Sequence, residues 1–178
     1  MPLDKALLRA LDGTPHFLAP LAFGATYLGD FGGIFLLIGA YLFLFGRGER
    51  RRAGFTILVA LLFVLLSADL ALKPLVHRPR PFEVLGMRYL IGPAPGGYSF
   101  PSGHAAAAFA GAVAWILRAA KSAPGRSLPL AYALLVGWSR IYLGAHWPSD
   151  VLAGAVLGAL LGYVAARYIP TQFLGGAT

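Results

Sequence analysis

The chain has 178 residues, which suits one domain, and 58% of them are hydrophobic whereas only 12% are charged. A water-soluble domain this apolar would expose large sticky patches, whereas a membrane protein turns such a surface to lipid. The absence of cysteine excludes disulfides, thiolate catalysis and cysteine-ligated metals. The net charge is +8, and the basic residues stand at the ends of apolar segments, where they meet lipid headgroups rather than nucleic acid. We therefore expect residues 1–178 to form a single membrane-embedded domain.

The apolar segments predict an all-α bundle of about five to six transmembrane helices. Residues 3–11 are typical of a short amphipathic helix that lies on the membrane surface. The first span is expected within residues 17–45, where a glycine-rich break at 29–33 leaves open whether it is one broken span or two helices. Further spans are expected at 53–72, 102–120, 128–146 and 149–168.

The connections between these helices sort onto two sides of the membrane. The arginine-rich connection 46–52 and the connection 121–127 lie on one side, and the positive-inside rule assigns that side to the cytoplasm. The long connection 73–101 and the turn 146–150 lie on the other side, which then faces the cell exterior. Polar residues on this second side are candidates for a site.

Gly154, Gly158 and Gly162 recur at every fourth residue of the last expected span. Small residues at this spacing favour close packing between helices of the same chain. A second interpretation is a face on which a homodimer forms.

Three polar clusters interrupt the apolar chain, and all of them fall on the second side. They are Lys73 to Arg80-Pro81, Pro101-Ser102-Gly103-His104, and Ser139-Arg140 with His146 and Asp150. Taken singly, a lysine suits a helix end and a histidine suits a packed core. Asp69 stands four residues before Lys73 and is expected to pair with it. The coincidence of the three clusters on one side favours a site over these separate explanations.

The clusters contain what a phosphate ester requires of a binding site. Lys73 supplies a point charge, and Arg80 and Arg140 supply guanidinium forks that match the phosphate oxygens. Ser102 follows a proline and is a candidate N-cap, so that the first N–H groups of its helix form an anion site. Gly103 lets a ligand approach the backbone closely.

Two histidines lie near these anion-binding groups. His146 precedes Asp150 by four residues, and a carboxylate on one ring nitrogen would leave the other nitrogen free to attack. His104 is placed to protonate a departing oxygen. The spacing alone does not decide which histidine attacks.

In order and spacing these residues resemble the type-2 phosphatidic acid phosphatase superfamily. Its pattern is a lysine, six residues and Arg-Pro, then Pro-Ser-Gly-His, then Ser-Arg, five residues, a histidine, three residues and an aspartate, and every position is matched here. The resemblance implies a helical core, a phosphohistidine at His146 that Asp150 supports, and His104 as the general acid. It implies that phosphate is bound by Lys73, Arg80, Ser102, Gly103, His104 and Arg140, with no metal ion or other cofactor.

The resemblance further implies a lipid phosphate substrate, in a bacterial cytoplasmic membrane with the site facing the periplasm or cell exterior. Undecaprenyl diphosphate is the leading candidate, and phosphatidylglycerophosphate and phosphatidic acid are the alternatives. A lipid phosphotransferase, in which a lipid hydroxyl takes the phosphate from His146, is a related enzyme class. A non-enzymatic transporter would need polar residues throughout the bilayer depth, whereas here they crowd one face.

Overall fold

A computed structural model describes residues 2–10, 16–86, 95–171 and 174, and within these ranges every regular element is a helix. The expected all-α class is thereby confirmed for the described chain. The helices are α1 (Pro2–Ala10), α2 (Ala19–Gly29), α3 (Gly33–Phe45), α4 (Glu49–Val64), α5 (Lys73–Val76), α6 (Pro81–Leu85), α7 (Gly103–Arg118), α8 (Ala123–Tyr142) and α9 (Pro148–Tyr168). Leu65–Leu72 is a π-helical segment that continues α4 into α5, and short 3₁₀ turns lie at His16–Leu18 and Asp30–Gly32.

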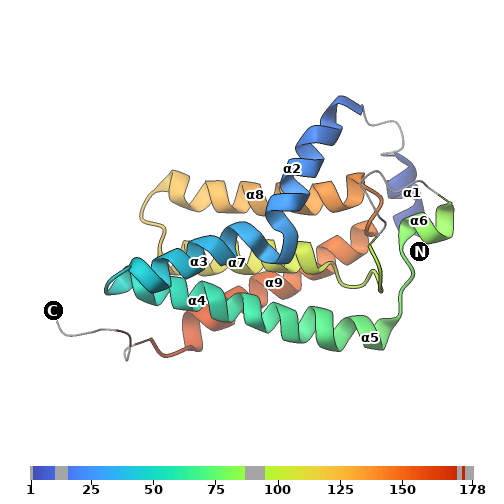
Figure 1. The fold of residues 1–178 in the computed structure, drawn as a ribbon. Helices are drawn as coiled ribbons and strands as arrows, with labels where there is room; N and C mark the ends of the chain where they lie inside the picture. The colour runs from blue at the N-terminus through green and yellow to red at the C-terminus, as the bar shows by residue number, and fades with distance from the viewer. Residues whose placement is uncertain (1, 11–15, 87–94, 172–173, 175–178) are drawn as a thin grey trace.

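The long helices run side by side, and their connections gather at two ends of the bundle (Figure 1). The α3–α4 and α7–α8 connections and the C-terminal end of α9 lie at one end. At the other end lie α1, the end of α5, α6 and the start of α9. This arrangement matches the two sides expected from the sequence.

Within the part of the chain that the structure describes, length and composition identify fewer spans than the sequence predicted. Glu49–Leu85 and Pro148–Tyr168 are each long and apolar enough to cross a membrane, and α2 with α3 forms a third candidate as one bent pair. The break between them falls at Asp30–Gly32, where Gly32 has a left-handed φ of 71°. α7 does not qualify because it has only 16 residues. It contacts α4, α8 and α9, so its surface faces protein and does not need the large apolar side chains of a lipid-facing helix.

Small residues let α7 occupy this central position. Its fully or nearly fully buried residues are Ala105, Ala106, Ala107, Ala108, Ala110, Gly111, Ala112 and Ala114. The glycines of α9 pack directly on the α7 backbone, where an added Cβ would lie 2.4 Å (Gly154 to Ser102 O), 2.0 Å (Gly158 to Ala106 O) and 2.5 Å (Gly162 to Ala110 O) from a carbonyl oxygen. The glycine repeat therefore serves packing within the chain, as the first interpretation predicted, and α7 covers it against a second copy.

Replacing Gly158 with alanine is expected to destabilise the bundle. The new methyl group would overlap the Ala106 carbonyl oxygen, a backbone atom that moves only if α7 and α9 separate, and such overpacking costs about 1–3 kcal/mol. Thermal unfolding in detergent measures the effect as a lower Tm. Gly24→Ala is the matched control, because nothing lies within 4 Å of a Cβ there. Equal Tm values for the two variants would contradict the packing described here.

Candidate active site

The three polar clusters meet at the end of the bundle that carries α1 and α6. The Ser102 N–H donates to the Asp150 carbonyl at 3.0 Å, which joins the second cluster to the third. Arg80 Nη1 lies 3.3 Å from His146 Nε2, which joins the first cluster to the third. Residues more than 60 positions apart in the chain are thus in direct contact. The convergence expected from the sequence is present in the structure.

The N-terminus of α7 is built as an anion site. Ser102 is its N-cap, and the Ser102 Oγ accepts a hydrogen bond from the Ala105 N–H at 3.4 Å. The carboxylate of Asp69 lies against this N-terminus, since a Cβ on Gly103 would come within 2.8 Å of Asp69 Oδ1. Lys73 Nζ donates to the same carboxylate oxygen, so the expected Asp69–Lys73 pair is confirmed. A carboxylate therefore sits where the N–H groups of a helix start favour negative charge.

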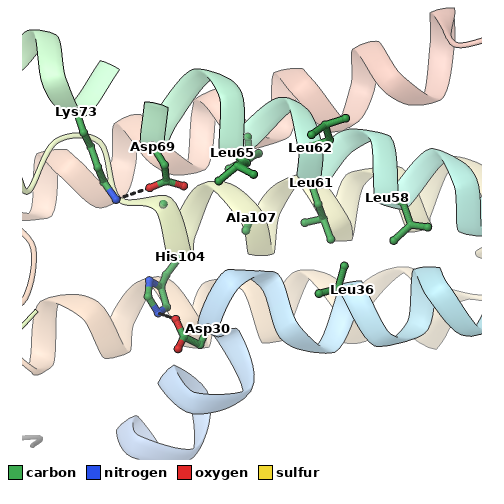
Figure 2. Close-up of a pocket in the computed structure, with 12 residues that line it drawn as sticks. Asp30, Leu36, Leu58, Leu61, Leu62, Leu65, Asp69, Lys73, His104 and Ala107 are labelled. Carbon is green, nitrogen blue, oxygen red and sulfur yellow. Dashed lines mark hydrogen bonds and ion pairs between the residues drawn. The ribbon is translucent and has the colours of Figure 1, made fainter. Parts of the chain in front are cut away.

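His104 lines the same cavity as this ion pair, and its ring points toward Asp30 (Figure 2). Its Nε2 lies 3.2 Å from Asp30 Oδ1 at the break between α2 and α3. Its ring is close enough to Arg140, His146, Lys73 and Arg80 for their charges to act on it. His104 is therefore a member of the same electrostatic site as the other predicted residues.

The cavity extends from these polar groups along the leucines of α3 and α4 (Figure 2). Its volume is about 450 Å³, and apart from Asp30, Asp69, Lys73, Gly103 and His104 its lining is apolar. The apolar residues are Leu36, Leu58, Leu61, Leu62, Val64, Leu65 and Ala107. A polar mouth with an apolar extension suits an amphipathic ligand.

Arg80 and Arg140 are the buried cations of the site, with 4% and 3% of their surfaces exposed. The Arg80 guanidinium donates to four backbone carbonyls, those of Gly96, Gly97, Tyr98 and Ala145, at 3.0–3.3 Å. Arg140 Nη1 donates to Thr26 Oγ1 at 2.9 Å. Sequence reasoning missed Thr26, because a single threonine in the apolar α2 carries no signal for a contact with α8.

The hydrogen bonds of His146 determine which of its ring nitrogens carries the proton. Arginine only donates, so Nε2, which faces Arg80 Nη1 at 3.3 Å, must be the unprotonated nitrogen. Nδ1 therefore carries the proton and donates it to the Ser99 carbonyl at 2.7 Å. This tautomer leaves the lone pair of Nε2 directed toward the cations of the site.

The structure places a different acceptor on His146 Nδ1 from the one that the sequence predicted. Asp150 Oδ2 is 3.8 Å from Nδ1, which is beyond hydrogen-bond distance. The carboxylate is held instead by the Trp147 N–H at 2.9 Å and by Arg78. Ser99 could not be found from the sequence because its contribution is a backbone carbonyl.

His146 lies in the turn between α8 and α9, outside both helices, and only 2% of its surface is exposed. Burial of the ring, together with the charges of Arg80 and Arg140, lowers the pKa of His146 from 6.5 to about 4, whereas Asp150 opposes the shift. Because the neutral form is favoured, Nε2 keeps its lone pair at physiological pH.

The tautomer and the low pKa can be measured directly. In ¹⁵N NMR of histidine-labelled protein in detergent, with His146→Gln to identify the signals, Nε2 is expected in the unprotonated range and Nδ1 in the protonated range. Neither should shift until the pH falls to about 4. Titration near the ordinary histidine value of about 6.5, or a proton on Nε2 at neutral pH, would contradict this description of the ring.

Comparison with known proteins finds relatives that cover most of the chain. The model of the PAP2 superfamily matches residues 34–174. An undecaprenyl-diphosphatase of Sulfolobus acidocaldarius is 33% identical over 160 residues, which cover 90% of this chain and 71% of the relative. The crystal structure of LpxE from Aquifex aeolicus superposes with a TM-score of 0.75 at 29% identity, and covers 93% of this chain and 96% of that one.

A second solved structure is a transmembrane PAP2-type phosphatidylglycerolphosphate phosphatase from Bacillus subtilis, with a TM-score of 0.70 at 27% identity over 92% of this chain and 83% of that one. The matched range 34–174 encloses all three polar clusters, and both neighbours reproduce nearly the whole helical arrangement. The chain belongs to the PAP2 superfamily of membrane lipid phosphatases.

Proposed function

We propose that this PAP2 phosphatase removes the terminal phosphate of a lipid diphosphate, with His146 as nucleophile. The observation that carries the proposal is the unprotonated Nε2 of a buried imidazole, 3.3 Å from the Arg80 guanidinium. A nitrogen lone pair beside an anion-binding cation is what attack on phosphorus requires. In the first step Nε2 forms a bond to phosphorus as the bond to the leaving oxygen breaks.

The remaining residues have roles that follow from their charges. Lys73, Arg80 and Arg140 hold the phosphate oxygens, together with the N-terminus of α7 at Ser102 and Gly103. His104 gives its proton to the leaving oxygen. In the second step water attacks phosphorus, the nitrogen–phosphorus bond breaks, and His104 takes the proton of the water.

The reaction needs no metal ion in this proposal. The described residues hold no group of three or more histidine or carboxylate side chains suited to a metal. Three cationic side chains instead stabilise the negative charge on the phosphate oxygens, which is the part a metal ion would otherwise play. Asp150 acts beside His146 as a fixed negative charge.

The cavity and the relatives support the proposed choice of substrate and its orientation. The apolar lining of the cavity beyond Lys73 and His104 suits a substrate whose hydrocarbon chain stays in lipid while its phosphate enters the polar mouth. Undecaprenyl diphosphate is the leading substrate because of the Sulfolobus acidocaldarius relative. Phosphatidylglycerophosphate is the second candidate because of the Bacillus subtilis structure, and phosphatidic acid is the third.

We further propose that residues 1–178 act as one domain with five to six spans, in which α7 crosses the membrane enclosed by other helices and α8 crosses with its exposed leucines toward lipid. The arginine-rich α3–α4 connection would lie in the cytoplasm. The site would then face the periplasm or exterior of a bacterial cell.

A panel of phosphates tests the function. Purified protein in detergent with excess EDTA is expected to release phosphate from undecaprenyl diphosphate with the highest kcat/KM. Glycerol phosphate is expected to be at least about 100-fold poorer, because each buried methylene contributes about 0.8 kcal/mol to binding. Equal turnover of glycerol phosphate, or loss of activity with EDTA that magnesium restores, would contradict the proposal. Label recovered on an acceptor lipid would indicate a phosphotransferase.

A pair of tryptophan variants tests whether the apolar cavity binds the lipid chain, independently of the reaction at the phosphate. Leu65→Trp would fill the cavity and is expected to raise KM for the long-chain lipid, but not for a short-chain phosphate. Leu70→Trp is the matched control, because Leu70 lies on the same π-helical segment, is 62% exposed and does not line the cavity. Equal effects of the two variants would remove the cavity from the account of substrate binding.

A further inference from the structure

Arg78 lies two residues before Arg80 and takes no part in the proposed reaction. Its Nη1 donates to Asp150 Oδ1 and, at 2.7 Å, to Ser149 Oγ. Its Nη2 donates to Asp4 Oδ2 at 2.6 Å. The side chains of Arg78 and Asp4 are 12% and 11% exposed, and that of Asp150 is 0% exposed. A guanidinium that is shared by two carboxylates and largely buried from solvent forms strong, directional hydrogen bonds.

Asp4 belongs to α1, yet it completes the start of α9. Asp4 Oδ1 accepts the Ser149 N–H at 3.0 Å, and Oδ2 accepts the Ser149 hydroxyl at 2.8 Å. The first N–H groups of a helix have no partner within the helix, so this carboxylate acts as a cap supplied by another element. Burial raises the pKa of Asp4, but the hydrogen bonds from Ser149 and Arg78 outweigh it and leave the pKa lowered. Asp4 is therefore ionised at neutral pH.

Arg78 is connected to His146 by two routes. Its side chain holds Asp150, whose other oxygen accepts the Trp147 N–H at 2.9 Å, next in the chain to His146. Its backbone carbonyl accepts the Ser99 N–H at 2.8 Å, and the Ser99 carbonyl in turn accepts His146 Nδ1. The backbone beside the imidazole and the acceptor on its ring are thus both attached to Arg78.

Loss of the guanidinium would change the electrostatics around His146. The charged and titratable groups that act on its ring are Arg80, Arg140, Asp150 and His104. Arg78 neutralises the negative member of this set. Without it, Asp150 would be a fully buried carboxylate held by the Trp147 N–H, and it would turn toward Nδ1, 3.8 Å away. The imidazolium would then be favoured, and the fraction of unprotonated nucleophile would fall.

We propose that Arg78 and Asp4 are positioning residues for His146, and that α1 thereby supplies part of the active site. Asp4 orients Arg78, which holds Asp150 through its side chain and the Ser99 N–H through its backbone carbonyl. The Ser99 carbonyl then accepts from the imidazole, and Asp150 holds the adjacent backbone through the Trp147 N–H. The inference rests on the proposed role of His146 as nucleophile. It assigns to α1 a function in catalysis, in addition to the contact with the membrane surface that the sequence predicts for this helix.

Kinetics and NMR on four variants test this inference. Arg78→Gln and Asp4→Asn are each expected to lower kcat about 10- to 100-fold, as loss of an outer partner does at other sites, with KM within about twofold. In both, the ¹⁵N titration of His146 should move upward from about 4. The double variant should lose no more activity than Arg78→Gln alone, because both residues act along one route. Glu49→Gln is the control, since it removes a similar arginine partner, that of Arg52, at the opposite end of the bundle.

The outcomes separate this inference from the proposed function. The positioning role would be overturned if the fold-losses in kcat of the two single variants multiply in the double variant. It would also be overturned if the titration of His146 does not move. If Arg78→Gln fails to fold, Asp4→Asn carries the same test, because it leaves the Arg78–Asp150 pair in place. A wild-type protein that cleaves no lipid phosphate would instead contradict the proposed function, while the NMR titration would still report on the positioning of the ring.

Discussion

The backbone contact between α7 and α9 is the constraint on which the site depends. Because Gly158 has no side chain, α9 approaches the Ala106 carbonyl so closely that a Cβ would lie only 2.0 Å from it. The same contact brings the starts of the two helices together, where the Ser102 N–H donates to the Asp150 carbonyl at 3.0 Å. The anion-binding end of α7 and the turn that carries His146 are therefore fixed relative to each other by main-chain atoms rather than by flexible side chains.

The cations of the site have partners of different strength, and this affects how phosphate would enter. The Arg80 guanidinium rests on neutral carbonyls, and Arg140 donates to the hydroxyl of Thr26. Lys73 is paired with a carboxylate, that of Asp69, which also lies against the start of α7. In the proposed reaction the phosphate takes the place of this carboxylate, so that binding exchanges one anion for another and avoids leaving a cation unpaired.

Short-range patterns in the sequence predicted most of what the structure contains. The N-cap at Ser102 and the packing role of Gly158 follow from residue type and spacing, which act within one or two helical turns. Ser99, Thr26 and Arg78 could not be predicted, because the first acts through its carbonyl and the others through contacts with helices that are distant in the chain. Within the described residues, length and composition alone identify only two or three spans, because a helix enclosed by protein, like α7, needs neither the length nor the apolar side chains of a lipid-facing one.

The central claim is that His146 Nε2, and not His104, attacks phosphorus. Rapid quenching after mixing with ³²P-labelled lipid diphosphate, followed by peptide mass spectrometry, locates the covalent phosphate. The account predicts an acid-labile adduct on His146 that is absent from His146→Ala. The adduct should still form in His104→Ala, although more slowly by about 10²–10⁴-fold because proton donation is lost. An adduct that persists in His146→Ala but is absent from His104→Ala would contradict the assignment.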